Sequence, residues 1–181
     1  MCIRDSIGLG TLARWLGTER VVRAMPNTPA LVGQGMTGLY TPAATPDADR
    51  ELAESALRST GQLLWVDDEA LIDSVTAVSG SGPAYVFFFI EALEQAGVEM
   101  GLTAEQAHQL AVGTFTGASA LAAASNDTPA VLRQRVTSKG GTTFAAISSM
   151  EADRVKDSIV RALHAARLRA QELEQEFGRA D

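Results

Sequence analysis

The sequence has one cysteine, Cys2, and no group of cysteines and histidines at the spacing of metal ligands. A single cysteine excludes an intramolecular disulfide, and the missing group excludes an ordinary zinc site. The absence of disulfides fits a reducing compartment, so we expect a cytoplasmic protein without a resident metal.

Long apolar stretches are also missing. The longest runs from residue 83 to residue 90, far short of the roughly 20 residues that a membrane-spanning helix needs. The N-terminus has no apolar core of the kind found in secretory signals. The net charge is −7 and the basic residues are scattered, which argues against a broad nucleic-acid surface. We therefore expect neither a membrane nor a nucleic acid as a partner.

The first third of the chain has the pattern of an α/β protein. Short β-branched or apolar stretches at residues 21–25, 36–41 and 62–66 predict strands, and residues 47–57 predict an amphipathic helix. Three short strands cannot make a self-sufficient doubly wound sheet. We therefore expect residues 1–67 to be an α/β remnant, the tail of a larger Rossmann-type sheet.

Residues 68–181 are expected to form an all-helical domain. The stretch 84–96 is nearly apolar on every side, and Gly97 is expected to end or weaken its helix. Thr103 and Gln106 form a capping-box pattern at the start of the next helix. A helix without a polar face must be covered, which in so short a chain predicts a partner subunit.

A glycine turn between residues 138 and 143 is the strongest candidate for chemistry. Two glycines before a helix allow several backbone N–H groups to point at one spot, where the helix dipole also favours an anion. A small carboxylate fits better than a triphosphate, because Lys139 precedes the glycines instead of following them as in a Walker motif. The alternative is an ordinary turn with a threonine cap. The candidate ligands are Ser138, Gly140, Gly141, Thr142 and Thr143.

Two other segments carry polar residues near expected bends. Pro26 and Pro29 enclose Asn27 and Thr28 in a rigid loop after a strand, where ligands of α/β sheets often sit, although a stiff connector is the plainer interpretation. The segment Ser79-Gly80-Ser81-Gly82-Pro83 lacks the glycine spacing of a nucleophile elbow and reads as a bend between packed helices.

Three segments resemble the pyrroline-5-carboxylate reductase family in order and spacing. They are VVRAMPNTPALV at 21–32, VTAVSGSGPAY at 75–85, and residues 129–151 with VTSKGGTT at their centre. The resemblance covers about residues 7–178.

The resemblance implies that NADPH or NADH transfers a hydride to the imine carbon of 1-pyrroline-5-carboxylate, giving L-proline in the last step of proline biosynthesis. The glycine turn would hold the substrate carboxylate, and Thr143 would relay or orient a proton at the ring nitrogen. Pro26 and Asn27 would border the nicotinamide. The helical domains of the family interlock into homodimers, often stacked into larger rings, and residues of one subunit complete the site of the other.

The sequence departs from the family pattern in several places. Lys139 stands where many members have proline, and Asn126 replaces a common acidic residue, which puts a cofactor contact there in doubt. No G-x-G-x-x-G motif lies between a strand and a helix, so the phosphate-binding units are missing. We interpret Met1–Ser6 as a truncation scar or a translation artefact.

Two alternatives remain at the sequence level. One is a non-enzymatic helical dimerisation module. The other is a hydroxyacid-type dehydrogenase, which would be expected to present a catalytic lysine on a helix. Lys139 lies in a turn and Lys156 in a polar terminal helix, so neither fits that role.

The missing phosphate site leads to a first prediction. We expect the purified 181-residue chain to show little or no NADPH-dependent reductase activity, because nothing in it grips the pyrophosphate. A spectrophotometric assay with 1-pyrroline-5-carboxylate checks this, and robust turnover would contradict it.

Overall fold

The computed structural model describes residues 7–178, so the expectations about Met1–Ser6 and Cys2 fall outside the described residues. The chain forms two compact units. Within the described residues, one unit comprises residues 7–84 and 161–178, and the other comprises Tyr85–Val160.

The first unit is built on a three-stranded sheet in the order β1-β2-β3. Its strands are β1 (Arg23–Met25), β2 (Gly35–Tyr40) and β3 (Gly61–Trp65). The pair β1–β2 is antiparallel and the pair β2–β3 is parallel. All three predicted strands are present, and β1 is shorter than predicted because Val21 donates its N–H to Glu19 instead of to a neighbouring strand.

Glycines fix how closely β2 and β3 approach at their first rung. Gly35 pairs with Gly61, and a Cβ on Gly61 would lie 2.1 Å from the carbonyl oxygen of Gly35. Gly61 also has a φ of 138°, which side-chain-bearing residues rarely adopt. The two strands can therefore start side by side only with glycine at both positions.

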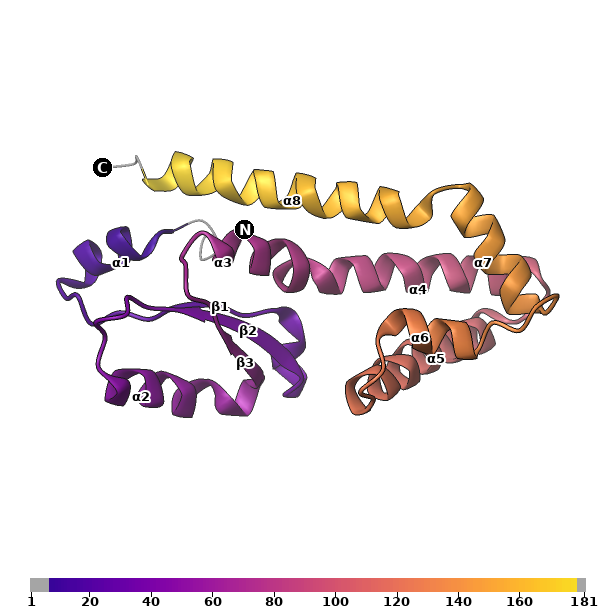
Figure 1. The fold of residues 1–181 in the computed structure, drawn as a ribbon, viewed down its shortest axis with the longest axis horizontal. Helices are drawn as coiled ribbons and strands as arrows, with labels where there is room; N and C mark the ends of the chain where they lie inside the picture. Colours follow the sequence, from indigo (N-terminus) through magenta and orange to yellow (C-terminus); the bar gives the residue numbers. More distant parts are fainter. Residues whose placement is uncertain (1–6, 179–181) are drawn as a thin grey trace. The chain divides into compact units, whose positions relative to one another are not determined.

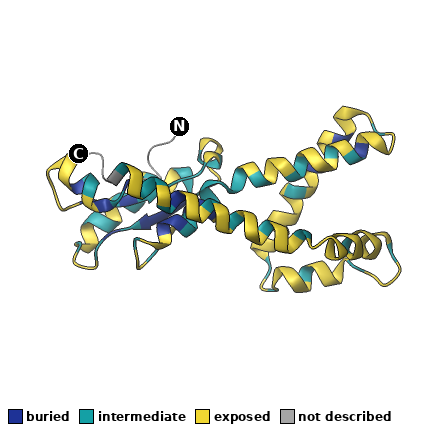
Figure 2. Ribbon diagram, turned by 90° about the horizontal axis from the view of Figure 1, so that it is seen from above, coloured by how far each residue is buried: buried dark blue, intermediate teal, exposed yellow. Residues whose placement is uncertain are grey.

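Helices lie on both faces of this sheet (Figure 1). The helix α2 (Asp47–Leu57) covers one face, where Trp65 Nε1 donates to Glu54 at 2.7 Å. The helices α1 (Leu9–Leu16) and α3 (Leu71–Val75) lie on the other face. The buried residues of the unit gather around this sheet (Figure 2), with a small core of Leu9, Ala13 and Val21.

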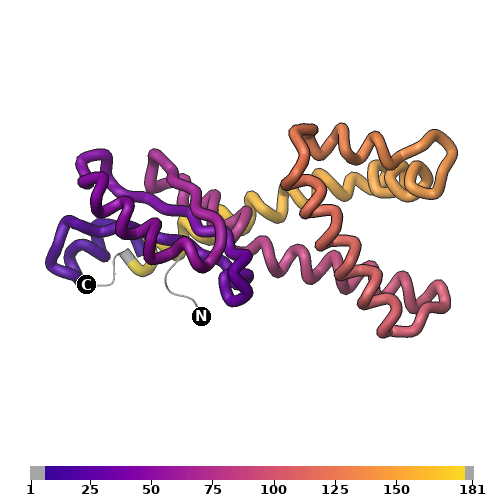
Figure 3. Tube along the Cα trace, turned by 90° about the horizontal axis from the view of Figure 1, so that it is seen from below, coloured from indigo at the N-terminus to yellow at the C-terminus, as the bar shows by residue number. Residues whose placement is uncertain are grey.

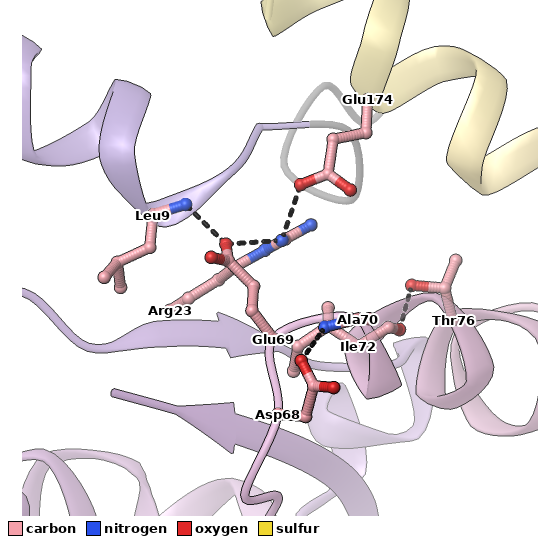
Figure 4. Close-up of polar contacts among 8 residues, drawn as sticks. All are labelled: Leu9, Arg23, Asp68, Glu69, Ala70, Ile72, Thr76 and Glu174. Carbon is pink, nitrogen blue, oxygen red and sulfur yellow. Dashed lines mark hydrogen bonds and ion pairs between the residues drawn. The ribbon is translucent and has the colours of Figure 1, made fainter. Parts of the chain in front are cut away.

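One buried arginine joins four segments of the first unit. The Arg23 side chain is only 2% exposed, and its Nη1 lies 2.8 Å from Glu69 and 3.0 Å from Glu174 on the last helix. Glu69 also accepts the N–H of Leu9, at the start of α1, at 2.5 Å (Figure 4). Because a buried charge is costly unless it is paired, these carboxylates hold the end of the last helix against β1.

The second unit is helical, as predicted. It contains most of α4 (Gly82–Glu99), all of α5 (Ala104–Ala124), α6 (Pro129–Arg135) and α7 (Thr142–Ala152), and the start of α8 (Val155–Gly178). The predicted capping box at Thr103 is confirmed by reciprocal hydrogen bonds with Gln106. Arg154, between α7 and α8, is the one non-glycine residue with positive φ among residues 7–178, at 53°.

The helices α4 and α5 form a hairpin joined at residues 100–103 (Figure 3). Gly97 does not end α4, as the sequence had suggested; the helix runs on to Glu99. A Cβ at Gly97 would lie 2.9 Å from the Cβ of Ala107, so this glycine serves close contact between the two helices. Among the described residues, no helix combines the length and the apolarity that crossing a bilayer requires.

The two units do not divide the chain where its secondary structure changes. The last strand ends at Trp65, close to the predicted boundary at residue 67, but the first unit continues to Ala84 and includes the end of α8. The division into 1–67 and 68–181 follows the change from strands to helices, and it stays a prediction about domains.

A second buried charge lies beside the Arg23 cluster. The Asp73 side chain on α3 is 3% exposed, and its Oδ1 has no hydrogen-bond partner. Burial raises the pKa of the Asp73 carboxyl, and the Glu174 carboxylate raises it further, while Arg23, Arg167 and Gln171 oppose the rise. The folded chain therefore binds this proton more tightly than the unfolded chain does.

The sign of the resulting pH dependence follows directly. A raised pKa contributes stability below the unfolded pKa, and this contribution is lost as the pH rises through the folded pKa. We expect Asp73→Asn to raise the free energy of unfolding by about 1 kcal/mol at pH 8, with a gain that shrinks toward acidic pH. Urea unfolding at several pH values measures this. Asp67→Asn, at an exposed position, is the matched control, and an equal effect from both variants would contradict the prediction.

Candidate functional site

The glycine segment at residues 138–141 forms a tight turn in the second unit. Gly141 donates its N–H to the carbonyl of Ser138 at 3.0 Å, and Gly140 has a φ of 76°. Lys139 does not have a positive φ, so the turn is of type II, with Lys139 second and Gly140 third. The third position of this turn requires glycine for steric reasons, which explains why the sequence places one there.

The turn leads straight into α7 and leaves the start of that helix open. Gly141 is the N-cap and supplies no side chain, and the first turn of α7 contains no acidic residue. The first hydrogen bond of the helix runs from the N–H of Ala145 to Gly141 at 3.1 Å. The N–H groups of Thr142 and Thr143 precede this bond, so they are available to an anion at the positive end of the helix.

A Cβ at Gly141 would lie 2.7 Å from the Oγ of Ser138. The Ser138 hydroxyl therefore sits directly beside the backbone of the N-cap. Thr142 and Thr143 are exposed and Gly141 is half-buried. The structure thus brings together the whole predicted set on one turn and one helix start: Ser138, Gly140, Gly141, Thr142 and Thr143.

Two arginines of α6, the helix before the turn, form ion pairs. Arg135 pairs with Asp127 and so links the end of α6 to the loop before it. Arg133 pairs with Glu151 of α7 at 3.0 Å, and the Thr137 hydroxyl donates to the carbonyl of Arg133 at 2.6 Å. The Arg133–Glu151 pair links the two helices that flank the turn. A hollow of about 440 Å³ lies between the same helices and is lined by Thr137 and Phe144, the residues on either side of the turn.

The charge around the turn contrasts with the rest of the chain. The whole sequence has a net charge of −7, yet residues 128–150 contain no Asp or Glu and include Arg133, Arg135 and Lys139. Both arginines are paired with carboxylates outside this stretch. Lys139 is exposed, so its ammonium group adds positive charge beside the open helix start.

The second candidate segment, Pro26 and Asn27, belongs to the first unit and follows the end of β1. Both residues are half-buried. The Asn27 side chain accepts the N–H of Met36 at 2.9 Å and donates to the carbonyl of Ser79 at 3.1 Å. The side-chain amide of Asn27 therefore has internal partners on both sides, and the rigidity of the loop stays a prediction.

Two groups of residues in and around the site were missed at the sequence level. The pairs of Arg133 and Arg135 were not predicted, although the absence of acidic residues from 128 to 150 was a visible signal. The bond from Asn27 to Ser79 spans 52 residues and had no sequence signal. Within residues 7–178, no group of three or more His, Cys, Asp or Glu side chains is placed to hold a metal ion.

Comparison with known proteins identifies what this arrangement resembles. A family model described as pyrroline-5-carboxylate reductase dimerisation matches residues 69–173. A pyrroline-5-carboxylate reductase of Pseudomonas aeruginosa is 48% identical over 177 residues, which are 97% of this chain and 65% of that protein. The Haemophilus influenzae reductase is 40% identical and matches 92% of this chain and 66% of its own length. The chain thus spans just under two thirds of these relatives.

Solved structures give the same result. The pyrroline-5-carboxylate reductase of Coxiella burnetii superposes with a TM-score of 0.88 at 42% identity, covering 93% of this chain and 63% of that one. The Plasmodium falciparum reductase with NADP bound gives a TM-score of 0.85 at 31% identity, covering 93% and 68%.

The type II turn gives a prediction about Lys139. Proline suits the second position of such a turn, and no backbone hydrogen bond uses the N–H of Lys139. We expect Lys139→Pro to raise the free energy of unfolding by about 0.4–1 kcal/mol, because it restricts the unfolded chain. Gly140→Ala should lower it by about 1–2 kcal/mol, because alanine resists the positive φ.

Urea unfolding of both variants measures these changes. Lys139→Ala is the control that removes the charge without adding the ring. A Lys139→Pro variant less stable than Lys139→Ala would show that the turn is of another type.

Proposed function

Because the chain belongs to the pyrroline-5-carboxylate reductase family, we propose that it forms the substrate-binding and dimerisation part of an enzyme that reduces 1-pyrroline-5-carboxylate to L-proline. The observation that carries the proposal is the open start of α7 behind the type II turn. An anionic ring acid is the kind of ligand that such a helix start favours.

In this proposal the turn binds the substrate carboxylate. The backbone N–H groups of Thr142 and Thr143 donate to the carboxylate, together with the hydroxyl of Ser138, and Gly140 and Gly141 bring the backbone close to it. The ammonium group of Lys139 adds attraction without a fixed geometry. No carboxylate from the first turn of α7 competes for the site.

We assign to Thr143 the task of handling the proton at the ring nitrogen of the substrate. It is the second residue of α7, so its side chain leaves the helix next to the amides that hold the carboxylate. A hydroxyl is a weak acid, so its role at an imine that enters already protonated is to accept a hydrogen bond from the iminium N–H and orient it, and at a neutral imine it is to relay one proton to the nitrogen before the hydride arrives. Reduction then leaves a neutral secondary amine that takes up a proton from solvent.

A reduced nicotinamide, NADPH or NADH, supplies the hydride when it is bound. The solved Plasmodium relative holds NADP. In this chain the residues that fit the nicotinamide end are Pro26 and Asn27, in the half-buried loop at the end of β1. Among residues 7–178, no strand leads through a glycine-rich turn into a helix in the manner of a pyrophosphate site.

The partner of the chain is a second copy. The matched family model describes dimerisation, and α4 leaves Phe87 58% and Phe88 69% exposed. Exposed phenylalanines at successive positions of one helix are typical of an uncovered interface. We propose that the second copy covers them and that the dimer is cytoplasmic.

The test uses a joined reductase, in which this chain follows the N-terminal segment of the Pseudomonas aeruginosa relative that has no counterpart here. We expect Thr143→Val to lower kcat about ten- to hundred-fold, with a smaller change in the substrate KM. Ser149→Ala removes an exposed hydroxyl from the same helix and should leave both constants unchanged.

A binding measurement with the 181-residue chain complements the kinetics. L-proline should shift the amide resonances of Gly141, Thr142 and Thr143, whereas pyrrolidine, which lacks the carboxylate, should not. Shifts centred elsewhere, or full activity of Thr143→Val, would refute the assigned roles.

A further inference from the structure

Asn27 fills two gaps in the backbone hydrogen bonding of the first unit, each in a segment that contains a proline. The first gap is in the sheet. The ladder between β1 and β2 ends at the pair Met25–Gly38, where Pro26 follows, and continuing the register would place residue 27 opposite Met36. The side-chain oxygen of Asn27 takes the N–H of Met36 at 2.9 Å in place of a main-chain partner.

The second gap lies just before α4. Thr76–Gly80 form a π-helical turn, in which the N–H of Ser81 donates to Thr76 at 2.8 Å. In an α-helix the carbonyl of Ser79 would receive the N–H of residue 83, but residue 83 is proline. The next N–H, that of Ala84, donates to Ser81. The carbonyl of Ser79 is therefore left to the Asn27 amide, which donates to it at 3.1 Å.

A packing contact joins the same two segments. A Cβ at Gly80 would lie 2.5 Å from the terminal methyl of Met25, the last residue of β1. The end of β1 and the π-helical turn thus touch through Met25 and Gly80 and are hydrogen-bonded through Asn27. The first residues of α4 follow directly and lead the chain into the second unit.

From these contacts we propose that Asn27 is a positioning residue, whose side-chain amide joins the Pro26 loop to the start of α4 and so sets the orientation of that loop. This inference rests on the proposed function, in which the Pro26 loop borders the nicotinamide. In this view Asn27 affects cofactor binding by orienting the backbone of the Pro26 loop. Its side-chain amide does not itself contact the cofactor. Any displacement of the start of α4 is passed to the loop by way of Ser79.

A suppressor experiment tests the link. Asn27→Asp keeps an acceptor for Met36 but loses the donor to Ser79 and faces its carbonyl with a carboxylate. Pro83→Ala restores a backbone N–H at position 83, which can serve Ser79 instead. In the joined reductase we expect Asn27→Asp to raise the cofactor KM about ten-fold and the double variant to return it to within about three-fold of the unchanged enzyme. Gln34→Glu, an exposed amide-to-acid change in the same segment, is the control.

Amide hydrogen exchange of the 181-residue chain separates the two halves of the link. Asn27→Asp should leave the Met36 amide protected, whereas Asn27→Ala should speed its exchange about ten-fold. Unchanged exchange of the Met36 amide in Asn27→Ala would show that Asn27 is not bonded to β2, and would overturn the proposal.

The kinetic outcomes distinguish the other readings. A variant that is less stable but keeps its cofactor KM would reduce Asn27 to a purely structural role and overturn the proposal. A raised KM that Pro83→Ala does not restore would mean direct contact with the cofactor, and would overturn it too. Failure of the unchanged joined reductase to turn over would instead count against the proposed function, and the exchange measurement would still decide whether the Asn27 side chain holds Met36.

Discussion

The paired burial of Arg23 is the interaction on which the first unit depends. Arg23 lies on β1 and its guanidinium has almost no access to water, and a charge in that position is tolerated only with carboxylates beside it. The two carboxylates come from 46 and 151 residues further along the chain. The buried charge of Arg23 on β1 thus needs a carboxylate from the end of α8. The first unit can therefore reach its final fold only when the chain has been made as far as Glu174.

A related constraint governs the backbone around the candidate site. Prolines at positions 26 and 83 remove donors or end a ladder, and glycines at positions 140 and 141 leave a helix start without a side-chain cap. In the first unit, the side chain of Asn27 fills the gaps. At α7 the amides have no side-chain cap, and it is there that we place the ligand. The same rule of backbone satisfaction thus separates a structural loop from a binding turn.

The sequence predicted best what short-range chemistry determines. The bounds of α2, the capping box at Thr103 and the turn before α7 all depend on residues within about four positions of each other. The cluster around Arg23, the partners of Asn27 and the contact of Gly97 with Ala107 depend on residues brought together by folding. Gly97 shows the difference well, because locally it looked like a helix end and spatially it is a contact point. The roles of the five turn residues rest on the family and not on local pattern.

The glycine pair that opens the parallel ladder has a consequence for how this protein can change. Neither glycine leaves room for a side chain, since one on Gly61 would meet the main chain of Gly35 and one on Gly35 would meet Ala30 and the carbonyl of Thr60. A single substitution at either position therefore requires the main chain around the first rung of the ladder to shift. We therefore expect natural sequence variation in this sheet to fall at positions other than these two glycines.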